Sequence, residues 1–354
     1  MPRPALLRSA VRRLMPVIAA ALFTILSAAP AMAQQWITYP AAEGAGGGKH
    51  IVFVAGEWEY RSEEGLPMLA KILSQHHGFK CTVVFPINKE TGEIDPNVND
   101  NVPGLEQLAD ADMMVMLAMD LELPDEQMKH IIDFANSGKP VLGFRCTVLA
   151  FRYNKNKESR YAKYDFRGTK ETGAAIPGGF GMVVLGETWR GHHGHHAVES
   201  TRGVINGRHR GHSILKGVAG DIWGPTDVYQ IDQLPENAVV LAYGQVLKGM
   251  KPDDVPNYAK PVMPMVWAFE RDVDGKPARV VTSTIGASED LESEDLRRIV
   301  VNGVYWCLGL ESKIPEKADV SYVDDFKATR FGRNKFTKGV KPANLAIQTK
   351  QAEK

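Results

Sequence analysis

Six of the ten histidines in this chain fall between positions 192 and 212. Four of them crowd the stretch His192-His193-Gly194-His195-His196, and His209 and His212 follow it. Imidazole is a common ligand of transition metals, and its pKa also suits proton transfer near neutral pH. No acidic residue lies inside the stretch, so a metal would need a further ligand from Glu187, Glu199 or elsewhere. Three interpretations stay open: a metal site, active-site histidines without a metal, or an exposed or structural segment.

A second candidate position follows the short apolar run from Pro140 to Gly143. An apolar run this short, entered after Gly138 and left at Gly143, predicts an interior strand that ends in a sharp turn. Turns at the carboxyl ends of parallel strands form the ligand crevice of open α/β sheets, and hydrolases hold their nucleophile there. The residues on this turn are Arg145 and Cys146. Arginine is a permanent cation and no nucleophile, so we expect Arg145 to hold a carboxylate, a phosphate or a polarised oxygen.

The segments that would position these residues alternate between strands and helices. Apolar runs predict the strands, and amphipathic spacing predicts helices that begin at acidic or proline-containing turns. The expected strands are 51–54, 81–85, 113–118, 140–143, 238–242, 262–269 and 279–284, and the expected helices are 63–76, 124–137 and 293–310. Because strand, helix and strand in succession form a right-handed crossover, the first strands should pair in parallel. We therefore predict an α/β fold, a flavodoxin-like three-layer sandwich with a mostly parallel sheet.

Two loops of this predicted fold carry further polar and aromatic side chains. The loop 56–62 should leave the carboxyl end of the first strand, and it holds Glu59 and Tyr60. The later segment 222–229 holds Asp227 and Tyr229. Carboxylates near imidazoles can orient the rings or exchange protons with them. For the first loop, a solvated turn with a helix cap is the alternative interpretation.

The first 33 residues have the pattern of a secretory signal peptide. Arginines precede an apolar run from Leu14 to Leu26, and Ala31-Met32-Ala33 offers a cleavage site. The run is short and interrupted by a proline, which disfavours a membrane anchor. Cleavage would remove four arginines and leave 38 basic against 42 acidic residues, from 42 of each. Without the positive charge that nucleic-acid binding needs, we predict an exported protein, periplasmic or secreted, that binds no nucleic acid and has no membrane span in its mature form.

Several motifs between residues 49 and 315 carry a family resemblance. They are Glu59-Tyr60-Arg61-Ser62-Glu63-Glu64, Leu123–Met128, Gly138–Val141, Leu185–Trp189, His192-His193-Gly194 with His196, Ser200–Gly203, His212 with Ile214-Leu215, Ile222–Tyr229, and Arg297-Arg298 through Tyr305-Trp306. On these motifs the chain resembles the ThuA-like (trehalose-utilisation) family, in particular secreted members from planctomycete-type bacteria. The resemblance implies the class I glutamine amidotransferase-like fold for residues 49–315, after a linker at 34–48 and before a basic tail at 316–354.

The same resemblance argues against glutamine hydrolysis. In amidotransferases of that fold a cysteine nucleophile stands where this chain has Arg145, and Cys146 lies one residue beyond. Because one step along an elbow redirects the side chain, we expect Cys146 to be buried rather than reactive. Many relatives also carry a histidine after the glycine of a late strand, where this chain has Gly286-Ala287. That difference places more weight on His193 and His196.

The activity that the resemblance implies is the conversion of a sugar or an oxidised (keto) sugar by an exported enzyme of hydrolase or lyase type. The expected catalytic residues are Glu59, Arg145, His193, His196 and Asp227. The expected substrate-binding residues are Tyr60, Trp189, His192, His212 and Tyr229. The expected partner is a small carbohydrate, and a homo-oligomer stays open. No cofactor is firmly implied, although a divalent metal stays open.

Two alternatives belong to other classes of protein. One is a non-catalytic periplasmic sugar-binding or scaffold protein that kept the fold without the chemistry. The other is a metal-dependent hydrolase built on His192, His193 and His196. The positions of the imidazoles relative to one another distinguish these alternatives.

Overall fold

The structure is a computed structural model that describes Met1 and residues 34–168 and 176–348. Apart from Met1, the predicted signal peptide at residues 1–33 lies outside the described residues. Among the helices in these ranges, none combines the length and the apolar character needed to cross a membrane.

Ten strands of the described residues form a single mixed sheet in the order β1-β3-β2-β4-β5-β10-β9-β8-β6-β7. The strands are β1 (Trp36–Tyr39), β2 (His50–Gly56), β3 (Lys80–Val84), β4 (Met113–Ala118), β5 (Val141–Phe144), β6 (Thr201–Ile205), β7 (Ile222–Gly224), β8 (Val239–Val246), β9 (Met263–Val273) and β10 (Lys276–Ser283). The sequence predicts seven of them to within a few residues at each end. It misses β6 and β7, and it misses β1, which lies inside the predicted linker.

The sheet is parallel in its centre and antiparallel outside it. The strands β3, β2, β4, β5 and β10 are joined by parallel pairings. Antiparallel pairings add β1 at one edge and β9, β8, β6 and β7 at the other. The prediction of a mostly parallel sheet therefore holds only for the central strands. A signal for the antiparallel part was present, since Asp274-Gly275 joins β9 to β10 with positive φ at both residues, as in a tight hairpin turn.

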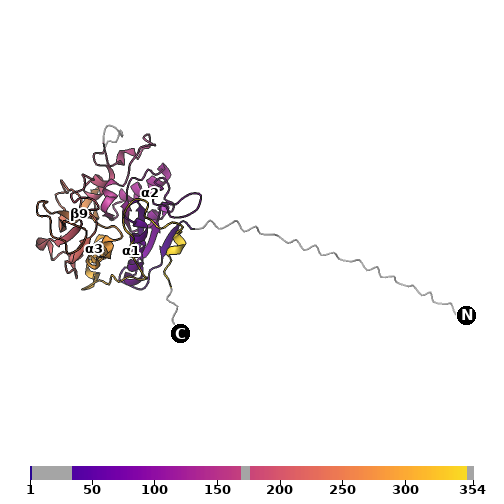
Figure 1. The fold of residues 1–354 in the computed structure, drawn as a ribbon. Coiled ribbons are helices and arrows are strands. Elements are labelled where there is room, and N and C mark those ends of the chain that lie inside the picture. Colours follow the sequence, from indigo (N-terminus) through magenta and orange to yellow (C-terminus); the bar gives the residue numbers. More distant parts are fainter. Residues whose placement is uncertain (2–33, 169–175, 349–354) are drawn as a thin grey trace. The chain divides into compact units, whose positions relative to one another are not determined.

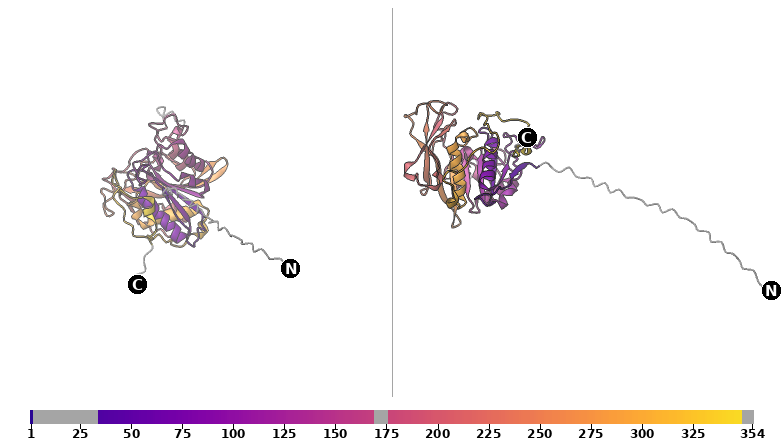
Figure 2. Two further views of the ribbon diagram at one scale, coloured as in Figure 1. Left: turned by 90° about the vertical axis from the view of Figure 1, so that its right-hand side faces the viewer. Right: turned by 90° about the horizontal axis from the view of Figure 1, so that it is seen from below.

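Three α-helices accompany the sheet in the described residues: α1 (Ser62–His77), α2 (Asp125–Ala135) and α3 (Glu294–Cys307). Glutamates 63 and 64 lie in the first turn of α1, and Gly78 ends the helix in a left-handed conformation. The side chain of Ser293 caps α3 by accepting a hydrogen bond from the Leu296 amide. The helices α1 and α3 lie side by side in two views of the fold (Figures 1 and 2).

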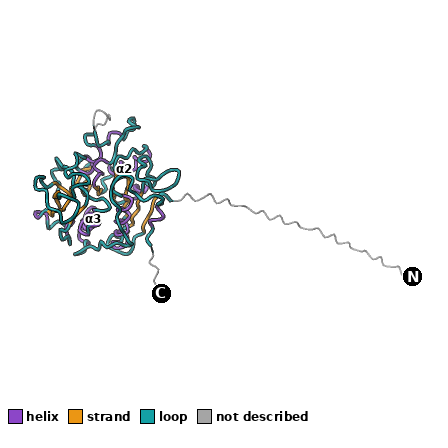
Figure 3. Tube along the Cα trace, viewed as in Figure 1, coloured by secondary structure: helices purple, strands orange, loops and turns teal. Residues whose placement is uncertain are grey.

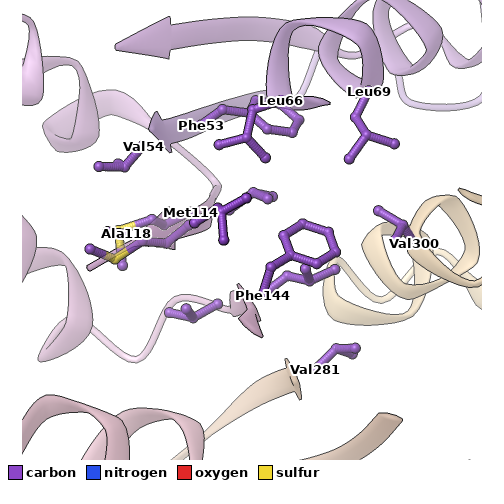
Figure 4. Close-up of a cluster of buried hydrophobic side chains, with 14 of the residues drawn as sticks. Phe53, Val54, Leu66, Leu69, Met114, Ala118, Phe144, Val281 and Val300 are labelled. Atoms are coloured by element: carbon purple, nitrogen blue, oxygen red, sulfur yellow. The ribbon is translucent and has the colours of Figure 1, made fainter. Parts of the chain in front are cut away.

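One part of the core lies between these two helices and the sheet, and the buried residues of α2 belong to the same core. Leu66 and Leu69 of α1 and Val300 of α3 point toward Phe53 and Phe144 of the strands (Figure 4). All five side chains are buried, and each contributes roughly 1.5–3 kcal/mol relative to an exposed position. This packing fixes where the strands end and thereby places the loops that follow them.

The turn after β5 lies one residue later than the sequence predicts. Gly143 is part of the strand, and a Cβ atom there would lie 2.7 Å from the Leu185 side chain. The chain turns instead at Arg145, which has a φ of 42°. A left-handed backbone at a non-glycine residue is strained and is typical of functional turns. The elbow that the sequence predicts therefore exists, with Arg145 at its apex.

The chain beyond α3 consists mainly of loops and turns (Figure 3). It passes over α1, where Lys71 and Asp324 form a salt bridge at 2.7 Å and Thr329 donates a hydrogen bond of 2.7 Å to Glu64. It then reaches β1, where the Tyr39 hydroxyl donates to the Leu345 carbonyl at 2.8 Å. The predicted basic tail is therefore packed on the domain over its described part.

Candidate active site

The centre of the site is the carboxylate of Asp227, which follows β7 and is completely buried. Its Oδ2 atom lies 2.7 Å from Nδ1 of His192, and its Oδ1 atom lies 3.0 Å from Nδ1 of His196. One carboxylate therefore orients two imidazoles. Backbone contacts hold the two segments together, because the amides of His193 and Gly194 both donate to the Val228 carbonyl.

Arg145 fixes this carboxylate from the side of the sheet. Its Nη1 atom donates to the carbonyls of Asp227 and Thr284 at 2.8 and 3.0 Å, and its Nη2 atom lies 3.3 Å from Oδ1 of Asp227. The guanidinium carbon also lies 4.1 Å from the ring centre of Tyr60 and 4.7 Å from that of Tyr229. Because Arg145 has no exposed surface, it cannot reach a ligand as the sequence analysis expects. Its task is to position Asp227.

These neighbours keep Asp227 ionised. Burial by itself raises the pKa of a carboxyl group. At Asp227, hydrogen bonds from His192 and His196 and the charge of Arg145 outweigh burial and hold the pKa well below its usual range. An ionised carboxylate can only accept hydrogen bonds. Nδ1 of both histidines therefore carries the proton.

His196 is a charged imidazolium at neutral pH. Its Nε2 atom lies 3.0 Å from Oε1 of Glu59, so both ring nitrogens face carboxylates. Hydrogen bonds to Asp227 and Glu59 raise the pKa of His196 from 6.5 to about 9. A ring that is protonated and engaged at both nitrogens is a poor general base. The predicted acid/base role therefore suits His196 less well than the sequence suggests.

His192 has the geometry of a general acid/base. Asp227 holds the proton on Nδ1, and Nε2 has no hydrogen-bond partner among the residues that the structure describes. About 35% of the side chain is exposed, so part of the imidazole is accessible to a ligand. The ring centres of Trp189 and Tyr229 both lie 5.7 Å from that of His192. The sequence analysis places this histidine among the substrate-binding residues rather than the catalytic ones.

Two buried acids that the sequence analysis does not select hold the loops of the site in place. Glu57 accepts hydrogen bonds from the amides of Glu59, Tyr60 and Ser62 at 2.6–2.8 Å. Its place three residues before Tyr60, in a loop already selected, is the only sequence signal for this role.

Asp290 is the second of these acids, and it holds the loop that carries Asp227. It accepts hydrogen bonds from the amide and hydroxyl of Thr226, which precedes Asp227, and from the amides of Gly286 and Ala287. It thus ties the Asp227 loop to the loop after β10. No pattern in the sequence marks it, because Thr226 lies 64 residues away along the chain and the nearer partners, Gly286 and Ala287, contribute only backbone amides.

Two histidines of the predicted site lie elsewhere. Nε2 of His193 binds the Pro261 carbonyl at 2.7 Å. Since His192 forms a β-bridge with Tyr229, successive side chains alternate in direction and His193 faces away from Asp227. His212 accepts a hydrogen bond from the Ile214 amide and packs against Trp306 of α3. Neither imidazole forms a hydrogen bond with Asp227, although the His193 amide binds the Val228 carbonyl.

The sequence profile of the ThuA family, described as trehalose utilisation, matches residues 50–307. The chain belongs to the ThuA family. Among solved structures, a ThuA-like protein from Bacteroides uniformis is 14% identical, with 76% of this chain and 95% of that one covered and a TM-score of 0.40. A ThuA-like protein from Parabacteroides merdae is 12% identical, with coverages of 80% and 97% and a TM-score of 0.43. No curated protein matches.

In this ThuA-family chain the predicted nucleophile position has no reactive thiol. Cys146 is completely buried, and burial raises the pKa of its thiol well above the usual value. A reactive cysteine needs an accessible thiolate. The arrangement thus offers no nucleophile of the amidotransferase type at Arg145 or Cys146.

The same ThuA-family site contains the one group that could hold a metal ion within the described ranges. Ligand atoms of His192, His196 and Asp227 all lie within 4.8 Å of one another. The contacts of 2.7 and 3.0 Å between Nδ1 and carboxylate atoms are hydrogen bonds, in which each Nδ1 atom carries a proton, whereas a nitrogen that binds a metal ion must be deprotonated. Metal binding would require the rings to turn or the Nδ1 protons to leave.

Proposed function

We propose that this chain is an exported enzyme of carbohydrate utilisation that acts on a sugar or an oxidised (keto) sugar, with His192 as its general acid/base. The observation that carries the proposal is the 2.7 Å contact between Oδ2 of Asp227 and Nδ1 of His192. It fixes the tautomer in which Nε2 is free to accept a proton. The ThuA family, described as trehalose utilisation, supports the choice of a carbohydrate.

The chemistry open to this arrangement is proton transfer. In a keto sugar, Nε2 of His192 would take the proton from the carbon next to the carbonyl while the glycosidic C–O bond on the other side of that carbon breaks. The same imidazole would then return the proton to the departing oxygen. Transfers of this kind by a positioned side chain accelerate reactions by about 10²–10⁴-fold. Asp227 stabilises the imidazolium that forms between the two transfers.

The residues that would contact the sugar are fewer than the sequence analysis expects. Tyr60 and Tyr229 are 2% exposed and lie against Arg145. Trp189 is partly exposed beside His192, and an indole face is well suited to the apolar face of a sugar ring. We assign sugar contact to Trp189 and His192, and a supporting role to the two tyrosines.

Glutamine amidotransferase activity is not part of the proposal. That activity depends on an accessible cysteine nucleophile, and the Cys146 thiol is buried with a raised pKa. Arg145 occupies the apex of the elbow, and its guanidinium donates a hydrogen bond to the Asp227 carbonyl.

The second candidate is a metal-dependent hydrolase. The observation in its favour is the clustering of His192, His196 and Asp227 within 4.8 Å. In that case a divalent ion would take these three residues as ligands and activate a bound water molecule. Elemental analysis of protein purified without a histidine tag separates the two candidates, since activity at full strength in metal-free protein excludes the hydrolase.

The test of the favoured function compares two neighbouring histidines. Turnover of a 3-keto disaccharide and of the unmodified disaccharide is measured for wild type, His192→Ala and His193→Ala. We expect about a 10²-fold or larger loss for His192→Ala and little change for His193→Ala, because only the first side chain faces Asp227. Equal rates in both variants would contradict the proposal. Calorimetric binding of the disaccharide without any product would favour a sugar-binding or scaffold protein instead.

A further inference from the structure

We propose that Arg330–Arg333 of the C-terminal tail form one wall of the active site, and that Phe331 positions His196 and limits the size of the ligand. These residues lie beyond the range 50–307 that the ThuA family profile matches. The wall itself is inferred from contacts alone. Its effect on substrate size rests in addition on the proposed function.

Phe331 packs against His196 and Tyr60. Its ring centre lies 5.7 Å from that of His196 and 6.0 Å from that of Tyr60. Only 4% of Phe331 is exposed. The His196 ring also lies 4.8 Å from the ring of His192. The imidazole of His196 is therefore in contact with both a tail residue and the proposed acid/base.

Hydrogen bonds join this part of the tail directly to the loop that carries Glu59. The Gly332 amide donates to the Glu59 carbonyl at 2.8 Å, and Nη2 of Arg61 donates to the Gly332 carbonyl at 3.1 Å. Gly332 has a φ of 132°, a conformation in which any side chain would be strained. Glycine at this position therefore allows the tail to turn while Gly332 contacts both Glu59 and Arg61.

A second anchor lies on the other side of Phe331. The Phe331 amide donates to Oε2 of Glu289 at 2.8 Å, and Arg330 forms a salt bridge with Oε1 of the same carboxylate at 3.3 Å. Glu289 precedes Asp290, the residue that holds the Asp227 loop. The tail is therefore tied directly to the loop of Glu59 and, through Glu289 and its neighbour Asp290, indirectly to the loop of Asp227.

The outer end of the wall is closed by Arg333, whose guanidinium carbon lies 5.1 Å from the ring centre of Trp58. The proposed route for a ligand is therefore past Trp189, whose ring centre lies 5.7 Å from that of His192. The wall therefore favours short sugars, because a longer chain extending past Glu59 would meet the ring of Phe331.

The first test follows the position of His196 and needs no substrate. Histidine side-chain resonances are recorded by ¹H–¹⁵N NMR for wild type, Phe331→Ala, the conservative Phe331→Leu, and the control Phe326→Ala. Phe326 is also an aromatic residue of the tail, but its ring packs 5.1 Å from that of Tyr322. We expect the His196 signals to move in Phe331→Ala, to move less in Phe331→Leu, and to stay in place in Phe326→Ala. His196 signals unchanged in both Phe331 variants would overturn the wall.

The second test measures ligand size. The ratio of kcat/KM for a 3-keto trisaccharide to that for a 3-keto disaccharide should rise by about 10-fold in Phe331→Ala, the scale expected when a pocket wall is removed. It should stay constant in Phe326→Ala. An unchanged ratio in Phe331→Ala would overturn the role in specificity. If wild type converts neither sugar, the proposed function fails, while the NMR comparison still decides whether the wall exists.

Discussion

Nε2 of His196 lies 3.0 Å from Oε1 of Glu59. Since Nδ1 of the same ring contacts Asp227, one imidazole joins the loop after β2 to the loop after β7. These two strands stand far apart in the sheet order. The charge on His196 therefore affects both sides of the site at once.

Stability should fall as the pH rises above neutrality. The pKa of His196 is raised from 6.5 to about 9 by its hydrogen bonds to Asp227 and Glu59. A raised pKa means that the folded state binds this proton more tightly, so the stabilisation is complete below about pH 6.5 and is lost as the pH rises through about 9. We expect a loss of roughly 1–2 kcal/mol after solvent screening. Urea unfolding across this pH range should show the loss of stability in wild type and a smaller loss in His196→Gln. Identical dependence of stability on pH in the two proteins would rule out a stabilising charge on His196.

Removing the charge of Asp227 should lower the catalytic rate. In Asp227→Asn the amide can donate as well as accept, so Nδ1 of His192 is no longer held as the donor. We expect kcat to fall by about 10²–10⁴-fold. Asp232→Asn is the control, because Asp232 is half exposed and bonds to Gln230. Comparable activity in the two variants would show that Asp227 does not orient the acid/base.

Arg145 should matter for stability to an unusual degree. Replacing one member of a buried charge pair typically costs about 3–5 kcal/mol. Although Asp227 would keep its contacts with His192 and His196, the buried carbonyls of Asp227 and Thr284 would lose their donor. Arg145→Gln should therefore lower the free energy of unfolding by an amount of that order. Arg152→Gln, which breaks a partly exposed salt bridge to Asp120, should cost less, about 1 kcal/mol. Similar urea midpoints for the two variants would mean that Arg145 does not support Asp227.

Cys146 should be dispensable for activity. Its thiol is completely buried, and burial raises its pKa well above the usual value. Iodoacetamide should leave the folded protein unlabelled at this position, and Cys146→Ala should retain turnover to within about twofold while losing at most about 1–2 kcal/mol of stability. Mass spectrometry after alkylation checks the first expectation. Rapid labelling together with loss of turnover would restore a nucleophilic role for this cysteine.

The sequence predicts the strand ends better than the side-chain directions. The apolar runs locate the central strands, and the elbow after β5 places Arg145 at the carboxyl edge of the parallel strands. The sequence cannot tell His192 from His193, because the choice depends on the bridge between His192 and Tyr229. It also cannot reveal Phe331, whose partners lie more than a hundred residues away. Residue type indicates the chemistry, whereas contacts between distant segments decide which of several residues of the same type can perform it.

The most direct measurement of the central claim is chemical rescue of His192→Ala. Free imidazole is added to this variant, and turnover of a 3-keto disaccharide is followed against wild type and His193→Ala. If Nε2 of His192 transfers the proton, imidazole should restore part of the lost rate and leave wild type and His193→Ala unchanged. Full activity of His192→Ala without imidazole would contradict the assignment.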